Sequence, residues 1–447
     1  MSPGIEAGPL SLHAEYLPNI RQVSVQISAP AGSHPEIALS ESRRAVSASL
    51  TLPEPVGCVS ETIKLPARVT EGSRRLLSST SANGHGAGQD TGLGREFSYR
   101  MQVDDDDGDA ELKKQRSAVD EHMDSFVPWS AGDMAPSTIL RCKQCEGIII
   151  GMPTATTTTA SPSNENSTVQ SSGWVWKDLP SGNWAEMMDF WHCHKPDPHE
   201  DDADGDHRHL TEDENSKVKG YGASNQVLAT PGTVLVDVAT FLVSEIDCKG
   251  LKKVAKEHTD GSLLPPDEEL LCDRCDALVG VQDTIAKGWR LFKTSLDAEL
   301  PSTGESEGVH WESHPTELVV AAQLLELIER ESARRFIIHC GKKDGLLLWV
   351  FNPDMRYSSS SSEHSIASQR AMKIFFQTKD NAEALLHPEP GKTSSLSLEE
   401  LRLPASTYNS LLATLGASNT MLPQSARTFQ EHWKVGVLHR FERWKRT

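Results

Sequence analysis

Two pairs of cysteines have the spacing of a metal-binding site. Cys142 and Cys145 form one C-x-x-C sequence, and Cys272 and Cys275 form another. Two thiolates three residues apart on a tight turn can bind one tetrahedral ion from the same side, and a second such turn supplies the other two ligands. The four cysteines therefore predict a structural zinc site, whose closed coordination leaves no open position for hydrolytic chemistry. The alternative is two unrelated pairs that are buried or redox-active.

The same local pattern surrounds each cysteine pair. Residues 139–151 read ILRCKQCEGIIIG and residues 270–281 read LLCDRCDALVGV, so each C-x-x-C lies between two short apolar runs. This pattern predicts a strand, a tight turn and a second strand at both places. It is typical of a zinc ribbon, here split by a long insertion. A shared zinc site requires that the fold bring the two hairpins together.

A second group of chemically capable residues lies in DFWHCHKPDP, residues 189–198. Cys193 is flanked by histidines, and an imidazolium beside a thiol lowers the thiol pKa. Cys193 with His194 is therefore a candidate nucleophilic pair. The alternative, which stays open here, is that Cys193 packs at a helix end while His194 bonds to a backbone carbonyl.

The other cysteines and histidines give weaker signals. We interpret His199, His207 and His209 as part of a solvated acidic loop, and Cys340 as a small apolar residue at the end of a core strand. Cys58 and Cys248 have no partner at a functional spacing. The sequence also lacks the glycine-rich nucleotide loops, the H-E-x-x-H motif and the G-x-S-x-G motif, which argues against ordinary ATPases, dehydrogenases, zinc proteases and hydrolases.

The composition limits the classes of partner. The chain has 447 residues and a formal net charge of −19, from 44 basic and 63 acidic side chains. Such a charge repels polyphosphate, so we expect neither direct nucleic-acid binding nor membrane binding. The N-terminus does not resemble a secretory signal, and the apolar windows are shorter than a membrane span, so we expect a protein of the cytoplasm and nucleus. Eight cysteines in a reducing compartment favour metal or redox chemistry over disulfides.

The arrangement of apolar residues predicts four regions. Hydrophobic residues are 37% and aromatic residues 6% of the chain, which indicates that part of it is unpacked. Period-two alternation, as in QVSVQIS, predicts short strands near the N-terminus, whereas an apolar stripe over residues 317–330 predicts an amphipathic helix. The regions are an N-terminal β region at 10–70, a largely disordered insertion with one strand at 71–132, a split zinc-ribbon region at 133–300 and an α+β region at 301–447.

These elements together predict the fold class. We expect an α+β protein that is mainly antiparallel β, with an N-terminal β domain, a zinc-pinned C-terminal α+β region and long disordered insertions. Helices are expected at residues 183–191, where Asn183 and Glu186 form a capping-box pattern, and from Pro404 to about residue 415.

The order of these motifs resembles the HECT-like ubiquitin-conjugating-enzyme-binding protein family, which is described as E3 ubiquitin-protein ligases. The resemblance rests on five segments in family order. They are the first C-x-x-C turn, LPSGNWAEMMDFWHCHKPDP at 179–198, the second C-x-x-C turn followed by Leu278, LLLWVFNPDM at 346–355, and LRLPASTYNSLLATLGASNTMLP at 401–423.

The resemblance implies a ligase, or a ligase accessory, for ubiquitin-dependent protein degradation. Its partners would be a ubiquitin-conjugating enzyme, ubiquitin and a protein substrate. A HECT mechanism needs a cysteine that accepts ubiquitin as a thioester, and in true HECT lobes this cysteine lies near the chain end. Here no cysteine follows Cys340, so the candidate acceptor is Cys193. Alternatively, the protein only positions the conjugating enzyme and needs no thiol of its own.

A second reading of the resemblance is a non-catalytic interaction protein. The family has also been tied to the messenger-RNA cleavage and polyadenylation machinery, which implies an assembly factor or a chaperone-like binder. A structural zinc without an open coordination position fits this function as well as it fits a ligase. The state of Cys193 distinguishes the ligase from the interaction protein: a ligase needs this cysteine exposed and thiolate-like, whereas the interaction protein allows it to be packed and inert.

Overall fold

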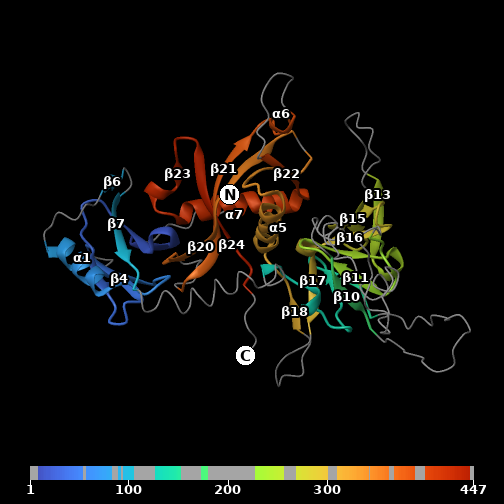
Figure 1. Ribbon diagram of the computed structural model, residues 1–447, viewed down its shortest axis with the longest axis horizontal. Helices are drawn as coiled ribbons and strands as arrows, with labels where there is room; N and C mark the ends of the chain where they lie inside the picture. The colour runs from blue at the N-terminus through green and yellow to red at the C-terminus, as the bar shows by residue number, and fades with distance from the viewer. Residues whose placement is uncertain are drawn as a thin grey trace, which may run out of the picture. The chain divides into compact units, whose positions relative to one another are not determined.

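A computed structural model describes the protein at residues 9–53, 57–82, 89–91, 94–104, 126–152, 173–179, 227–255, 268–300, 310–341, 343–361, 367–387 and 398–442. The chain divides into two compact units: unit 1 comprises residues 1–126 and 316–447, and unit 2 comprises residues 127–315. Antiparallel strands dominate both units and helices are few (Figure 1). The predicted fold class, α+β with mainly antiparallel β structure, is confirmed.

Unit 1 is built on a ten-stranded sheet that joins the two ends of the chain. Its main path runs β23-β24-β21-β20-β1-β2-β7-β6, and β19 pairs with both β20 and β22. The N-terminal and C-terminal strands meet where β1 pairs with β20, with His13 opposite Ser359. The strands are β1 Ser11–Leu17, β2 Gln22–Ala29, β6 Gln89–Thr91, β7 Gly94–Gln102, β19 Arg335–His339, β20 Gly345–Ser359, β21 Gln369–Lys379, β22 Leu398–Arg402, β23 Thr428–Phe429 and β24 Trp433–His439.

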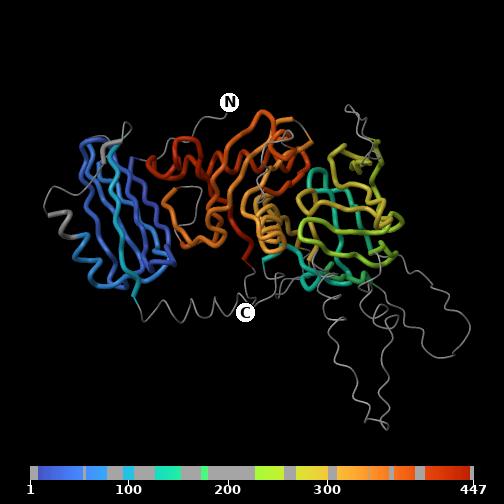
Figure 2. Tube along the Cα trace, turned by 45° about the horizontal axis from the view of Figure 1, so that its top comes forward, coloured from blue at the N-terminus to red at the C-terminus, as the bar shows by residue number. Residues whose placement is uncertain are grey.

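The N-terminal part of unit 1 has its own hydrophobic core. A second, three-stranded sheet is formed by β3 Glu36–Leu39, β4 Ala45–Thr51 and β5 Cys58–Lys64. Alternation places Val23, Val25 and Ile27 of β2 in the same core as Val46 of β4 and Ile63 of β5. The blue and cyan strands of Figure 2 trace the N-terminal strands of these two sheets. The predicted N-terminal β structure therefore forms around an apolar interior.

Helix α1, Glu71–Ala82, lies in the region 71–132, for which the sequence predicts a largely disordered insertion with one strand and no helix. Its composition is polar, but Leu77 is buried in the N-terminal core. The Arg74 guanidinium also donates hydrogen bonds to the carbonyl oxygens of Leu39 and Ser40, at 2.8 and 3.0 Å. Long-range contacts of two residues thus hold a helix whose sequence gives little apolar signal.

The C-terminal part of unit 1 packs two helices on one face of the sheet. Helix α5 spans Thr316–Glu331 and helix α7 spans Ala405–Met421, while the short α6 spans Glu383–Leu386. Buried residues of α5 and α7, such as Leu324 and Leu411, share a core with Phe336 of β19 and Ile374 of β21. Both long helices begin where the sequence predicts them. The helix predicted at 183–191 lies outside the described residues.

Unit 2 contains the zinc-type hairpins in two sheets. The seven-stranded sheet has the order β10-β11-β12-β16-β15-β14-β13, and the four-stranded sheet has the order β18-β17-β8-β9. The strands are β8 Leu140–Cys142, β9 Ile148–Ile150, β10 Val175–Asp178, β11 Thr233–Val236, β12 Thr240–Val243, β13 Leu251–Ala255, β14 Glu268–Cys272, β15 Leu278–Asp283, β16 Gly288–Phe292, β17 Leu296–Leu300 and β18 His310–Glu312. Both sheets contribute to one core, which also contains the four cysteines of the two C-x-x-C pairs.

In the described part of the chain, no helix combines the length and the apolar character needed to cross a bilayer.

Candidate metal centre

The two C-x-x-C turns have the same backbone geometry. In the first, the Cys142 amide donates to the Gly147 carbonyl at 2.8 Å, and the Glu146 amide donates to the Cys142 carbonyl at 2.9 Å. In the second, the Cys272 amide donates to the Ala277 carbonyl at 2.8 Å, and the Asp276 amide donates to the Cys272 carbonyl at 3.0 Å. Each strand therefore turns tightly after its first cysteine and returns antiparallel, as the sequence predicts.

A left-handed residue closes each turn. Glu146 has φ 59° and Asp276 has φ 58°, both immediately after the second cysteine of the pair. This backbone conformation is uncommon for residues other than glycine, although aspartate tolerates it better than most residues do. Its repetition at equivalent positions indicates that both turns are shaped for the same purpose, which is to point two thiols to one side.

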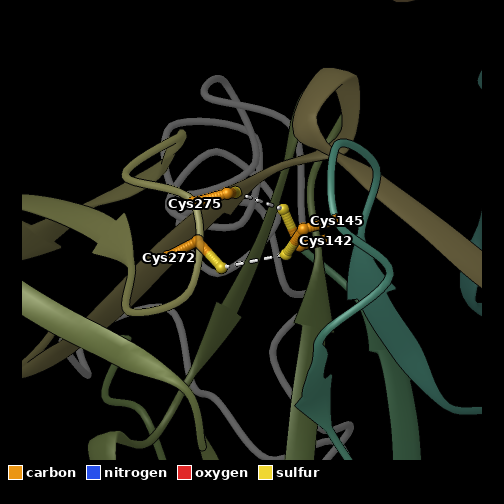
Figure 3. A group of neighbouring side chains, drawn as sticks. All are labelled: Cys142, Cys145, Cys272 and Cys275. Atoms are coloured by element: carbon orange, nitrogen blue, oxygen red, sulfur yellow. Dashed lines mark hydrogen bonds between the residues drawn. The ribbon is translucent and has the colours of Figure 1, made fainter.

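The fold brings the two turns together around a small space lined by sulfur (Figure 3). The Sγ atoms of Cys142 and Cys275 are 3.7 Å apart, and those of Cys145 and Cys272 are 3.5 Å apart. All four ligand atoms lie within 4.8 Å of one another. Zinc bound tetrahedrally at about 2.3 Å from each sulfur requires sulfur separations of about 3.8 Å. The geometry thus fits one four-coordinate ion and differs from two separate pairs.

Burial and backbone amides act in opposite directions on these thiols. Burial raises the pKa of Cys142 to about 12, because a thiolate there would lose its hydration. A hydrogen bond from the Gly147 amide lowers the pKa of Cys145. Such N–H···S bonds stabilise thiolates, and a divalent cation at the centre would stabilise them much further. The cluster is therefore chemically suited to hold a cation.

The surroundings of the first turn fix its position. The Arg141 Nε donates to Asp297 of β17 at 3.1 Å, and its guanidinium lies 4.1 Å from the centre of the Trp311 ring. At Gly147 the space is tight, since a Cβ atom would lie 2.9 Å from the Arg274 side chain, which belongs to the other turn. A larger residue at position 147 would therefore require the Arg274 side chain to move.

Sequence reasoning missed a buried lysine in the same unit. Lys293 is fully buried, and its Nζ donates to the carbonyl oxygens of Pro128 and Trp129 at 2.8 and 3.0 Å. Burial lowers its pKa to about 7. The neighbouring His314, whose ring centre is 4.7 Å from that of Trp129, has its pKa lowered to about 4 by burial. Nothing local in the sequence marks Lys293, because lysine is normally exposed.

The remaining sequence candidates lie either outside the described residues or elsewhere in the described fold. Cys193 and His194, and the three histidines at 199, 207 and 209, lie outside the described residues. Cys58 is exposed on β5, and Cys340 follows β19, both in unit 1. Cys248 packs against the unit 2 core, and burial raises its thiol pKa. Among the described residues, the only group of potential metal ligands is therefore the four-cysteine cluster.

Two relatives from yeasts resemble much of the chain. The uncharacterized protein YJR141W of Saccharomyces cerevisiae is 26% identical over 261 residues, which are 58% of this chain and 62% of the relative. The match thus spans less than two thirds of that relative's length. The uncharacterized protein C1734.10c of Schizosaccharomyces pombe is 24% identical over 330 residues, which are 71% of this chain and 78% of the relative.

A family model covers still more of the chain. The model described as HECT-like ubiquitin-conjugating enzyme (E2)-binding matches residues 15–435, a range that contains the four-cysteine cluster and most of both units. The motif order noted in the sequence agrees with this match. The chain therefore belongs to the HECT-like ubiquitin-conjugating enzyme (E2)-binding family.

Proposed function

We propose that this protein binds a ubiquitin-conjugating enzyme and promotes transfer of ubiquitin to a protein substrate, in the cytoplasm and nucleus. The observation that carries the proposal is the family match over residues 15–435, because the family is described by its binding to such an enzyme. The family description names only binding to the conjugating enzyme, so ligase activity and a protein substrate are further parts of this proposal. Ubiquitin-dependent degradation of the substrate would be the biological consequence.

The proposed cofactor is one structural zinc ion held by Cys142, Cys145, Cys272 and Cys275. Four thiolates would fill a tetrahedral coordination sphere, so the ion would stabilise the fold and bind no substrate. The two turns come from β8 and β14, which belong to different sheets of unit 2. Binding of one ion by both turns would therefore link the two sheets, and its binding free energy would add to the folding free energy.

The transfer chemistry can follow two routes. In the first, a thiolate of this protein attacks the thioester carbonyl between ubiquitin and the conjugating enzyme, whose cysteine leaves as a thiolate; a substrate lysine amine then attacks the new thioester. We propose Cys193, with His194 as its proton acceptor, for this role. In the second route, the protein orients the conjugating enzyme and the lysine amine attacks directly.

The described cysteines support Cys193 as the candidate acceptor by their own properties. Four of the seven described cysteines belong to the metal cluster. Burial raises the pKa of Cys248, which disfavours its thiolate. Cys58 is exposed on a strand without an adjacent histidine, so it provides a matched control rather than a competing candidate. Cys340 follows His339 but packs against the helix-covered core of unit 1.

A non-reducing gel assay tests the first route. The full chain is mixed with activating enzyme, a set of ubiquitin-conjugating enzymes and labelled ubiquitin, and Cys193→Ser is compared with Cys58→Ser. The expected result is a thiol-sensitive ubiquitin adduct in the native protein and in Cys58→Ser, and its loss in Cys193→Ser. An adduct that survives Cys193→Ser would refute this acceptor. Absence of an adduct together with faster discharge of the conjugating enzyme would favour the second route.

A further inference from the structure

Five aromatic side chains form a continuous patch on one face of the unit 1 sheet. We call Trp349, Phe351, Phe375, Phe429 and Trp433 the aromatic patch. The Phe375 ring is 4.5 Å from Phe429 and 4.8 Å from Phe351, measured between ring centres. Trp349 lies 5.3 Å from Phe375 and 6.1 Å from Trp433. Four neighbouring strands, β20, β21, β23 and β24, thus contribute to one aromatic surface.

The aromatic patch is on the sheet face opposite the core that α5 and α7 share with the sheet. Strand alternation places Leu348 and Phe376 in the helix-covered core, and their neighbours Trp349 and Phe375 on the other face. Phe375 is buried at the base of the patch, whereas Phe351 is 46% exposed. Trp349, Phe429 and Trp433 are half-buried. A contiguous, partly exposed aromatic surface of this kind is typical of a protein interaction site.

Cationic side chains border the aromatic patch. The Arg335 guanidinium lies 5.1 Å from the centre of the Trp349 ring, and Arg335 is opposite Trp349 in the β19–β20 register. Lys379 of β21 is on the same face by alternation but farther along the strand, opposite Gly345, and its Nζ donates to the Gln377 side chain at 2.6 Å. Neither cation forms an ion pair within the described residues. The border is thus locally positive in a chain of net charge −19.

We propose that the aromatic patch is the docking surface for the ubiquitin-conjugating enzyme, through a segment that presents a large apolar side chain beside a carboxylate. This inference rests on the proposed function. The apolar side chain would contact Phe351 and Trp349, while the carboxylate would pair with Arg335 or Lys379. All of these residues lie within the range matched by the E2-binding family. Aromatic residues and arginine are also the residues that most often dominate binding energy at interfaces.

The charge of the border argues against a second copy of this chain as the occupant. A two-fold symmetric dimer would place the same surface on both sides of the interface. The cationic borders formed by Arg335 and Lys379 would then repel each other. A partner with an acidic docking segment has no such penalty.

The test measures binding of the full chain to purified ubiquitin-conjugating enzymes that carry ubiquitin through a stable amide bond. Phe351→Ser removes the exposed ring, and Arg335→Glu reverses the border charge. Two matched controls are available in unit 1. Ile20→Ser changes an apolar residue that is 49% exposed outside the patch, and Lys434→Glu makes the same charge change on the opposite sheet face, where Lys434 pairs with Phe376.

The expected result is a loss of affinity of about 10- to 30-fold for Phe351→Ser and a lower association rate for Arg335→Glu, with both controls unchanged. Circular dichroism melting verifies that each variant is folded. Native affinity in both patch variants would overturn the docking surface while leaving the proposed function intact. If the native chain bound none of the enzymes, both the docking surface and the proposed function would fall. A native dimer that Phe351→Ser dissociates would identify a second copy as the occupant and overturn the proposal.

Discussion

At the scale of single residues, the metal centre is the part of the protein that sequence reasoning reached most directly. The spacing of Cys142 and Cys145, repeated by Cys272 and Cys275, predicts the two turns because a C-x-x-C hairpin is a local structure. Their meeting could not be derived locally, since the first turn follows β8 and the second follows β14 of another sheet. Lys293 was missed because its burial depends on distant carbonyl groups at Pro128 and Trp129.

Removal of one metal ligand is expected to destabilise unit 2. Cys272→Ser should release zinc and lower the melting temperature by about 10 °C or more, because the ion's binding free energy is part of the folding free energy. Elemental analysis and calorimetry measure the two effects. Cys248→Ala, which changes a non-ligand cysteine of the same core, should retain zinc. Zinc at native stoichiometry in Cys272→Ser would contradict the shared site.

The buried Lys293 predicts a pH dependence of stability. Its pKa is about 7 in the folded protein against an ordinary value of 10.5, so between these values the unfolded chain binds a proton that the folded chain does not. The free energy of unfolding should therefore rise with pH across this window. Below it, Lys293 is protonated in both the folded and the unfolded chain, so it adds no pH dependence. Relative to Lys293→Met, the free energy of unfolding of the native protein should increase by about 1 kcal/mol per pH unit between pH 8 and 9.5.

Urea unfolding at several pH values measures this difference. Lys253→Met is a suitable control, because the Lys253 ammonium is at the surface and pairs with Glu245. Parallel stability curves for the native protein and Lys293→Met would refute the low pKa of Lys293.

At the scale of elements, alternation and helical periodicity were informative where one face is buried. The period-two pattern identified β2 and β4, and the apolar stripe at residues 317–330 identified α5 nearly to its ends. Helix α1 was missed because its contacts to Leu39 and Ser40 are long-range. Likewise, the pairing of β1 with β20 joins segments from opposite ends of the sequence, which no local pattern encodes.

Two glycines should respond oppositely to alanine. Gly280 of β15 lies against the Arg290 backbone of β16, so a Cβ atom would collide with the carbonyl oxygen and destabilise unit 2 by about 2 kcal/mol or more. Gly416 is an exposed position within α7 with open space around it, so Gly416→Ala should stabilise unit 1 by about 0.5–1 kcal/mol. Chemical denaturation measures the change in unfolding free energy for both variants. A neutral Gly280→Ala would show that the two strands can separate without cost.

At the scale of the whole molecule, the function depends on what the two units present to partners. Unit 2 provides a candidate zinc-stabilised fold, while unit 1 carries the aromatic patch with its cationic border. The proposed partner is a ubiquitin-conjugating enzyme, which the family description names. The order of short motifs in the sequence points to the same proposed partner, but no local pattern predicts the aromatic patch, because its five residues come from four strands.

We propose that this protein accelerates ubiquitin transfer from a conjugating enzyme. The most direct measurement is single-turnover discharge of thioester-linked ubiquitin from purified conjugating enzymes onto free lysine, with and without the full zinc-loaded chain. Faster discharge by at least one enzyme is expected, with a weaker effect of Phe351→Ser at limiting concentration. Discharge at the uncatalysed rate for every enzyme, at concentrations that saturate binding, would contradict a role in ubiquitin transfer.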